Sequence, residues 1–467
     1  MTSAATRREH DLLGTAEVPA EALYGIHTLR ALGNFAISGV PLSTLDDLIQ
    51  GLASVKLAAA KANRDLGLLS PAIADAIISA CDEIRAGRWH EEFVIDTIQG
   101  GAGTSTNMNA NEVIANRAIV LLGGAPGDYH MIHPLDHVNL CQSTNDVYPT
   151  SAKLAAYQAA DRLLRALEEL QLAFTHRAHA FAEVVKIGRT QLQDAVPMTL
   201  GQEFGAFGTM LADSGRRIDE ARSALTEVNL GGTAVGTGLN AQIGYAERAC
   251  TELRSVTGVP FHLSHAPVAA TQDVGPFVHL SGALKLTAVR LSKICNDLRL
   301  LGSGPRAGFG DIHLPAVQAG SSMMPGKVNP VIPEVVNQAA FRVIGNDTTI
   351  TLSAEAGQLQ LNAFGPVIIT TLLDSIGLLT AAATALARRC VTGIRPDMEN
   401  LGSHVRRSLG VVTALSPHIG YELATEVAEE AALTGREISD VVTCRGMLTS
   451  AQVSQILAQA HGTQAVR

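Results

Sequence analysis

Residues 277–301 read FVHLSGALKLTAVRLSKICNDLRLL, and this stretch decides the class of fold. Its apolar side chains recur at alternating steps of four and three residues, which places them on one face of an α-helix. They are Leu280, Leu284, Leu291, Ile294, Leu298 and Leu301, with Thr287 in the one polar position. The pattern predicts a long helix whose apolar face packs against other helices.

Three further stretches predict long helices, at residues 151 to about 188, 333 to about 357, and 367 to 391, the last closed by Gly393 and Pro396. The first shows the same stripe, formed by Leu163, Leu167, Leu170 and Phe174. Such lengths exceed the usual size of globular helices, so we expect an extended bundle. Apolar stripes of this kind favour a homo-oligomer whose bundle is shared between subunits, with a monomeric bundle as the alternative.

Residues 367–387 are apolar enough to suggest a membrane span, but Asp374 lies in the middle. Hydroxyl side chains also interrupt the run, at Thr370, Thr371, Ser375, Thr380 and Thr384. A carboxylate at the centre of a lipid bilayer is costly. The stretch therefore predicts a buried bundle helix.

The rest of the chain suggests three domains in a mainly α fold. Residues 1–142 mix short helices with glycine and proline, residues 143–395 hold the long helices, and residues 396–467 turn to shorter, more polar helices, one of them near 450–460. Convincing strand alternation is scarce.

Composition excludes several classes of function. The 467 residues carry a formal charge of −9, with a pI near 5.9, whereas nucleic acid or an anionic membrane would favour a basic face. The six cysteines are far apart and form no zinc pattern, so we expect reduced thiols, no metal site and no cofactor. The first residues, MTSAATRREHDLLG, lack the apolar core of a secretory signal, which favours the cytoplasm.

Residues 320–330, GSSMMPGKVNP, combine a hydroxyl pair, two glycines, a cation and an amide. Glycines let successive backbone N–H groups point at one oxyanion, and Lys327 adds a full positive charge. A nucleotide-binding P-loop is excluded, because five residues separate Gly320 from Gly326 and Val328 replaces the required hydroxyl. The stretch predicts a mobile loop that binds an anion; a plain surface turn is the alternative.

Three other polar clusters accompany this loop. They are GGAGTSTN at 100–107, QSTND at 142–146 and GRTQLQD at 188–194. Taken singly, each has an ordinary interpretation: a glycine turn, a capping segment before a helix, and a turn where that helix stops. The first lacks the third small residue of a dinucleotide fingerprint.

Together the four clusters resemble the aspartase/fumarase superfamily, and the resemblance extends from residues 24–30, YGIHTLR, into the C-terminal region. Within it, the chain is most similar to ammonia-lyases that act on aspartate. The resemblance implies a mainly α, three-domain homotetramer with a central twenty-helix bundle and four active sites, each built from three subunits. It implies reversible elimination of ammonia from L-aspartate to give fumarate, a small-molecule reaction.

By motif, the resemblance assigns a role to each site residue. Ser321 matches the base that removes the C3 proton. The α-carboxylate position matches Lys327 and Asn329, with Thr190 beside them. Hydroxyls around the β-carboxylate match Thr104, Ser143, Thr144 and Ser322, and the amino-group position matches Asn145 and Gln191.

The chemistry suits these residue types. Removing a proton beside a carboxylate builds a second negative charge there, so the resulting aci-carboxylate needs many preorganised donors. Serine is a weak base unless its alkoxide is stabilised, so Ser321 needs the loop's N–H groups and Lys327.

A fumarase and a non-catalytic structural member of the superfamily are the alternatives. Enzymes that resemble fumarase usually carry histidine at the position of Gln191, GSGT at residues 101–104 and QSSND at 142–146. They also tend to have QTQR where residues 27–30 read HTLR. Because hydroxide must be protonated to leave and Gln191 cannot supply that proton, glutamine fits deamination better.

Residues 308–313 read GFGDIH where relatives commonly show GLNEIN. Phe309, Gly310 and His313 are therefore unusual, and they could alter the dynamics of the following loop or the substrate preference. We expect His313 to be structural.

Overall fold

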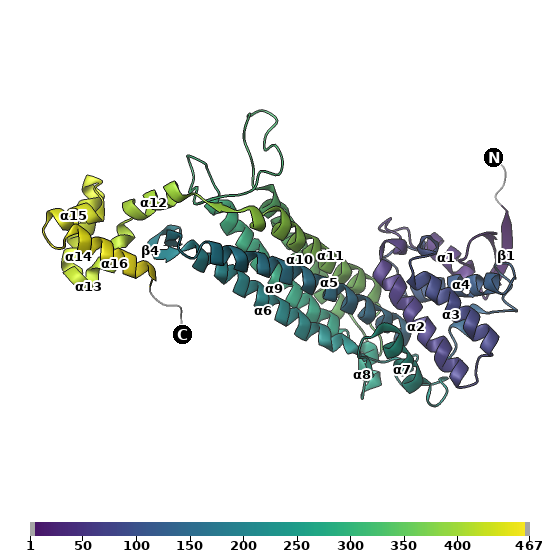
Figure 1. Cartoon of the computed structure of the whole chain (residues 1–467). Helices are drawn as coiled ribbons and strands as arrows, with labels where there is room; N and C mark the ends of the chain where they lie inside the picture. Colours follow the sequence, from purple (N-terminus) through teal and green to yellow (C-terminus); the bar gives the residue numbers. More distant parts are fainter. Residues whose placement is uncertain (1–4, 463–467) are drawn as a thin grey trace. The chain divides into compact units, whose positions relative to one another are not determined.

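The helices predicted from the apolar spacing are present in the computed structural model, which describes residues 5–462 and is 63% helix. The long helices are α5 (Thr144–Ala180), α6 (Leu200–Ser223), α9 (Gly275–Leu301), α10 (Val331–Glu355) and α11 (Gly365–Arg389) (Figure 1). All the stripe residues named for α5 and α9 are buried, including Thr287. The mainly α class is confirmed.

The other helices are shorter, and each sheet has two strands. The helices are α1 (Ile26–Asn34), α2 (Asp46–Asp65), α3 (Pro71–Arg85), α4 (Thr104–Leu121), α7 (Tyr245–Thr257), α8 (Pro267–Gln272), α12 (Met398–Arg407), α13 (Val412–Ile419), α14 (Tyr421–Thr434), α15 (Ile438–Cys444) and α16 (Ser450–Gly462). The sheets are β1 (Thr6–Asp11) with β2 (Gly14–Pro19), β3 (Val185–Thr190) with β4 (Gln193–Thr199), β5 (Glu227–Val228) with β6 (His262–Leu263), and β7 (Ile312–His313) with β8 (Arg395–Pro396).

The chain divides into two compact units. Unit 1 comprises residues 1–164, 216–286 and 342–379, and unit 2 comprises residues 165–215, 287–341 and 380–467. Each long helix contributes residues to both units. The three-domain division stays a prediction, and its outermost residues, 1–4 and 463–467, lie outside the described part of the chain.

In unit 1, polar contacts join neighbouring long helices. Asp347 of α10 accepts hydrogen bonds from Ser281 and Lys285 of α9, at 2.7 and 2.6 Å. Asn346, also on α10, donates to Asp374 of α11 at 2.9 Å. The carboxylate that argued against a membrane span therefore has a partner within the bundle.

In unit 2, aromatic and polar contacts join neighbouring long helices. The ring of Phe174 on α5 lies 5.8 and 5.6 Å from the rings of Phe204 and Phe207 on α6. Asn337 of α10 donates to the Ser292 hydroxyl of α9 at 2.9 Å.

By length and hydropathy alone, one helical stretch in the described residues, Gly365–Gly393, could cross a membrane, and half of its most apolar window is buried.

The prediction of only short helices before residue 142 was wrong, because α2 has 20 residues and α4 has 18. Alanine dominates the middle of α2, so its backbone can approach a neighbour closely. A Cβ at Gly51 would lie 2.6 Å from the carbonyl oxygen of Ser151. Helix α2 therefore packs directly on α5 through its backbone, and its middle, residues 51–60, is entirely buried.

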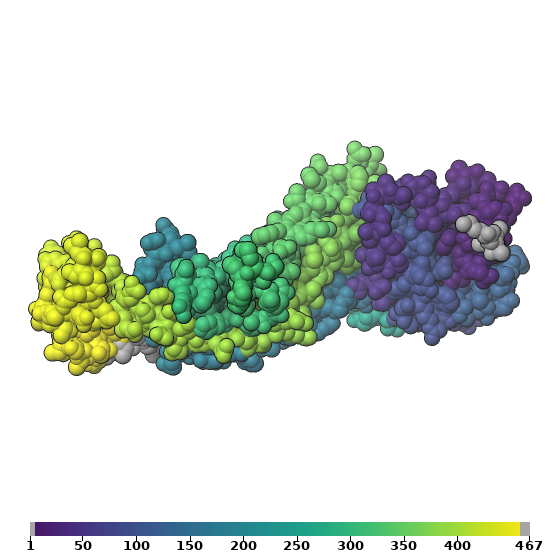
Figure 2. All heavy atoms as spheres, turned by 90° about the horizontal axis from the view of Figure 1, so that it is seen from above, coloured from purple at the N-terminus to yellow at the C-terminus, as the bar shows by residue number. Residues whose placement is uncertain are grey.

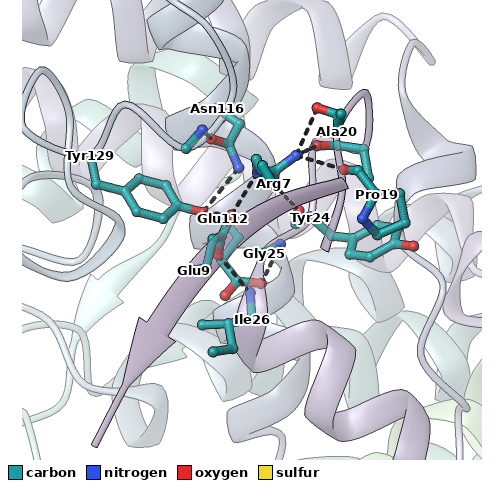
Figure 3. A network of polar contacts seen from close by, with 12 residues as sticks. Arg7, Glu9, Pro19, Ala20, Tyr24, Gly25, Ile26, Glu112, Asn116 and Tyr129 are labelled. Carbon is teal, nitrogen blue, oxygen red and sulfur yellow. Dashed lines mark hydrogen bonds and ion pairs between the residues drawn. The ribbon is translucent and has the colours of Figure 1, made fainter. Parts of the chain in front are cut away.

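Two carboxylates hold the start of α1, the helix that carries the HTLR segment (Figure 3). Glu112 of α4 is buried and accepts four hydrogen bonds, from the N–H groups of Gly25, His27 and Thr28 and from the Thr28 hydroxyl. Glu9 of β1 accepts a further bond from the N–H of Ile26 at 2.8 Å. The unpaired N–H groups of the first helical turn are thus satisfied by negative charge, which a helix N-terminus favours.

We predict that Gly25→Ala destabilises the protein by about 1–3 kcal/mol, because the new methyl group enters a filled space. A Cβ at Gly25 would lie 2.6 Å from the Tyr129 hydroxyl and 2.8 Å from Glu9 Oε2. Gly33→Ala in the same helix is the control, since no atom lies within 4 Å of its Cβ position. Urea denaturation of both variants checks this, and equal midpoints would contradict it.

The helix expected to reach residue 188 ends at Ala180, and an antiparallel hairpin, β3–β4, follows. The prediction of that helix end was wrong because long-range packing favours a strand. Ile187 on β3 is buried in a core with side chains of the C-terminal helices, among them Val411 and Leu415. These helices form one body in the space-filling view (yellow in Figure 2).

Candidate functional site

The loop at residues 320–330 connects the regions around α9 and α10, and its two ends are joined by hydrogen bonds. The N–H of Gly320 donates to the carbonyl of Lys327 at 2.8 Å, and Asn329 Nδ2 donates to the carbonyl of Gly320 at 2.6 Å. A Cβ at Gly320 would lie 2.6 Å from the Lys327 oxygen, so only glycine fits this crossing. These contacts between Gly320, Lys327 and Asn329 form the neck of the loop, and residues 322–328 are exposed.

Ser321 sits where this neck opens, and its side chain is held by backbone donors. Its Oγ accepts hydrogen bonds from the N–H groups of Met323, at 3.1 Å, and Met324, at 2.9 Å. Two donors aimed at one oxygen stabilise negative charge on it. The loop thus supplies the N–H groups that a serine base requires. Ser322, beside it, is exposed.

A cavity of about 550 Å³ in unit 2 is lined by Lys327 and Asn329, together with Arg299, His313 and Asp397. The amide of Asn329 faces the loop neck with one of its two N–H bonds, which leaves the second to bind elsewhere. Lys327 is exposed, and its ammonium makes no hydrogen bond or ion pair with the side chains and backbone that the structure describes. Both groups are therefore free to bind an anion.

The unusual residues of the GFGDIH segment all have structural partners in unit 2. The ring of Phe309 lies 4.3 Å from the Arg189 guanidinium, and Arg189 is paired with Asp311 at 2.6 Å. His313 Nε2 lies 3.1 Å from an Asp397 oxygen. The structural interpretation of His313 therefore fits its contacts, and an effect on the following loop stays a prediction.

Arg189 also connects this cluster to the hairpin that carries Thr190 and Gln191. The turn of the hairpin is formed by Gln191 and Leu192, at φ 53° and 64°. Positive φ at both central residues is typical of the type I′ turn, which usually requires Asn-Gly. Thr190 and Gln191 are exposed at the tip of a short, braced hairpin.

In unit 1, the segment Gly101-Ala102-Gly103 has three successive positive φ values, 88°, 56° and 90°. It leads into α4, whose first residue is Thr104, an exposed threonine. A Cβ on Gly103 would lie 2.7 Å from the ring of Tyr148, so the chain passes directly over that ring. Thr104 is thus fixed at a helix N-terminus, where a carboxylate is favoured.

The QSTND segment lies nearby in the same unit and begins α5. Asn107 of α4 donates to the Thr144 hydroxyl oxygen at 3.1 Å, which brings the two polar clusters together. The Ser143 hydroxyl oxygen accepts the N–H of Asn145 at 3.2 Å. Both hydroxyl oxygens accept a bond, so both O–H protons remain available to a ligand.

The side-chain amide of Asn145 is oriented by a hydrogen bond that it donates. Its Nδ2 donates to the carbonyl of Ala234 at 2.8 Å, and the side chain of Asn229 donates to the Asn145 carbonyl at 3.0 Å. Because the amide nitrogen is engaged, the amide oxygen is left as the acceptor, an assignment set by this network. An acceptor suits the amino group of a substrate.

The sequence reasoning missed the residues behind this segment. Asp146, fully buried, accepts the N–H groups of Ser143, Gly231 and Thr233 at 3.0–3.1 Å. Burial raises the pKa of Asp146 to about 6 against the lowering effect of these bonds and of Lys56. Lys56 on α2 is also buried, and the one signal in the sequence was its place directly before the apolar run at residues 57–60.

The predicted site residues thus form two groups. Thr104, Ser143, Thr144 and Asn145 belong to unit 1, while Thr190, Gln191, Ser321, Ser322, Lys327 and Asn329 belong to unit 2. Among the described side chains, no three His, Cys, Asp or Glu residues form a group that could hold a metal ion.

Comparison with known proteins places these groups in a family. A family model described as "Lyase" matches residues 14–345, and one described as "Fumarase C C-terminus" matches residues 411–460. An aspartate ammonia-lyase of Pseudomonas canavaninivorans is 54% identical, covering 98% of this chain and 97% of that protein. The aspartate ammonia-lyase of Escherichia coli K12 is 50% identical over 96% of this chain and 94% of its own length.

Solved structures of similar fold support the same family. The fumarate lyase:delta crystallin of Brucella melitensis, solved bound to cobalt, is 51% identical with a TM-score of 0.95, covering 98% of this chain and 99% of that one. The class II fumarase of Schistosoma mansoni is 35% identical with a TM-score of 0.94, covering 98% and 100%. With the loop motif, the helical fold and these matches in agreement, the chain belongs to the lyase family of aspartases and fumarases.

Proposed function

We propose that this protein is an aspartate ammonia-lyase, a carbon–nitrogen lyase that reversibly eliminates ammonia from L-aspartate to give fumarate. The observation that carries the chemistry is the geometry of Ser321, whose Oγ accepts two backbone N–H bonds within the signature loop. Relatives at 50–54% identity over nearly the whole chain are named for this reaction.

The reaction begins with proton transfer. The Ser321 alkoxide takes the C3 proton, and the electron pair left on C3 moves into the β-carboxylate to give the aci-carboxylate. That group gains a second negative charge. Thr104, Ser143 and Thr144, with Ser322 from the loop, donate O–H bonds to it. Hydroxyls placed before the reaction stabilise this charge without reorganising, which is the larger part of the catalytic effect.

The second step breaks the bond between C2 and nitrogen. The electron pair returns from the aci-carboxylate to form the C2–C3 double bond, and the protonated amine leaves as neutral ammonia. Asn145 accepts a hydrogen bond from the amine through its free Oδ1, and Gln191 is assigned to the same amino group. Since ammonia leaves without a further proton, an amide at position 191 is sufficient.

Lys327 and Asn329 bind the α-carboxylate, with Thr190 beside them. We predict that Lys327→Ala raises KM for L-aspartate about tenfold or more and changes kcat less, because an ion pair to the unreacting carboxylate is made equally in substrate and transition state. Initial rates across L-aspartate concentrations check this, with Lys61→Ala, at a partly exposed lysine of α2, as the control. An unchanged KM for Lys327→Ala would contradict the assignment.

We also propose a homotetramer in which each active site is completed by other subunits. Large apolar side chains of α10 are exposed in the single chain, with Val335, Phe341 and Leu352 at 49%, 61% and 63%. Half of the apolar window of α11 is likewise unburied. Burying such faces between copies of the same helix is the usual route to a stable closed oligomer. We place the enzyme in the cytoplasm, with a three-domain subunit.

The test is to incubate the purified protein separately with L-aspartate and L-malate, and to follow fumarate by ultraviolet absorbance and ammonia in parallel. Fumarate and ammonia in equal amounts from L-aspartate alone is the expected result. Fumarate from L-malate alone would make the protein a fumarase. If neither substrate gives fumarate, the proposal is overturned in favour of a protein that kept the fold and lost the reaction.

A further inference from the structure

A lysine ammonium is buried directly behind the hydroxyl-bearing segment of unit 1. Lys56 on α2 is fully buried, and its Nζ donates to Asn139 Oδ1 and to Gln142 Oε1, both at 2.9 Å. Burying a cation costs free energy unless polar partners surround it. These two amide oxygens offset part of that cost. Gln142 immediately precedes Ser143, and the Lys56 ammonium therefore contacts the first residue of the QSTND segment.

The amide contacts around Lys56 lead outward to Thr144. Asn139 Oδ1 also accepts a bond from Asn107 Nδ2 at 3.1 Å, and the same Asn107 nitrogen donates to the Thr144 hydroxyl oxygen at 3.1 Å. Asn107 is 1% exposed, so its side chain is held within the protein between these two contacts. Because the Thr144 oxygen accepts from Asn107, its own proton must be donated on the other side.

The opposite side of the segment is held by a buried anion. Asp146 binds the N–H of Ser143, and its carboxylate and the Lys56 ammonium attract each other, so each partly offsets the cost of burying the other. Burial lowers the pKa of Lys56 to about 7, and Asp146 acts to raise it. The residues between the two charges, 142–145, are thus fixed from both ends.

We propose that Lys56 is a positioning residue for the carboxylate that becomes the aci-carboxylate: through Asn139, Gln142 and Asn107 it holds the Ser143 and Thr144 hydroxyls as donors. It also places a buried positive charge behind them. Lys56 does not touch the substrate. This inference rests on the proposed function, and it assigns to α2 a role that the loop motif does not contain.

The experiment compares Lys56→Met, which is one atom shorter, keeps an unbranched side chain and removes the charge and donors, with Lys61→Met. Lys61 lies on the same helix, partly exposed, and pairs with Glu252 at 3.6 Å, outside the amide contacts. Fumarate formation gives kcat and KM, calorimetry gives the affinity for succinate, an unreactive dicarboxylate, and thermal unfolding reports the fold.

We expect Lys56→Met to lower kcat by about tenfold to a hundredfold and to weaken succinate less, because the extra charge appears only in the transition state. Lys61→Met should match the parent protein. A double-mutant cycle with Thr144→Ala separates positioning from general damage. If Lys56 acts through Thr144, the double variant loses little beyond Thr144→Ala, whereas independent effects multiply.

Asn107→Leu provides a second route, since it breaks the link to Thr144 while leaving the cation in place. If Lys56→Met does not fold, kcat and the succinate affinity of Asn107→Leu decide the question. A Lys56→Met enzyme with parental kcat, or losses that multiply in the cycle, overturns the inference and leaves the proposed function intact. A parent protein that binds succinate but does not turn over L-aspartate overturns the proposed function, and the Lys56 role is then decided by whether Lys56→Met weakens succinate relative to Lys61→Met.

Discussion

Ser321→Ala is expected to lower kcat for L-aspartate by roughly 10³-fold or more, because alanine cannot accept the C3 proton and no neighbouring group replaces it. The N–H groups of Met323 and Met324, which hold the Ser321 oxygen at 2.9–3.1 Å, would then have no anion to stabilise. Succinate should bind the variant nearly as well as the parent, since the proposed carboxylate contacts remain.

The measurement is fumarate formation by the purified variant, together with its thermal unfolding midpoint and its size in solution. Ser79→Ala is the control, because Ser79 is an exposed serine on α3 whose hydroxyl only bonds the backbone of its own helix. Both variants should keep the parental oligomer and midpoint. A Ser321→Ala enzyme that retains most of its activity would remove Ser321 from the role of base.

Gly103→Ala is expected to destabilise the protein by about 2–4 kcal/mol, from two separate causes. The residue has φ 90°, which costs any side chain, and its new Cβ would lie 2.7 Å from the Tyr148 ring. Tyr148 is only 4% exposed, so the ring cannot swing aside. The backbone must move, and Thr104, the next residue, moves with it, so kcat/KM should fall too.

Gly101→Ala separates the two causes. Gly101 has nearly the same φ, 88°, but the nearest atom to its Cβ position is 3.9 Å away. It should therefore lose only the backbone contribution, about 1–2 kcal/mol. Urea denaturation and L-aspartate kinetics on both variants decide the matter. Equal losses of stability would show that the Tyr148 contact is unimportant.

The long helices could be predicted because their apolar spacing is a local property of the sequence. The stripe through Leu280, Leu291 and Leu298 is buried as expected, and α9 begins two residues before the predicted start at Phe277. The polar position Thr287 is buried as well, in keeping with its place in the stripe.

The β3–β4 hairpin could not be predicted in the same way. Its turn uses Gln191 and Leu192 in place of Asn-Gly, so the usual turn signal is missing. Its strand is stabilised by Ile187 contacting residues more than 200 positions away, such as Val411. The one local sign was the β-branched run around Val184 and Val185, at the end of a strong helical pattern.

For the candidate site, motif resemblance located the side chains, whereas only the structure shows what holds them. The contacts of Ser321 and Asn329 are local to the loop and follow from its glycines. The bond from Asn107 to Thr144 spans 37 positions, and that from Lys56 to Gln142 spans 86. Contacts of such separation leave no periodic trace in a sequence.

The closed neck of the signature loop has a consequence for affinity. Because Gly320 is bonded to Lys327 and Asn329, the two ends of the loop are brought together when the chain folds. The conformational entropy of joining them is therefore lost on folding, and substrate binding has to order only the exposed tip, residues 322–326. Loosening the neck would transfer that cost to each catalytic cycle, and it would be measured as a weaker apparent affinity for every ligand that the closed loop contacts.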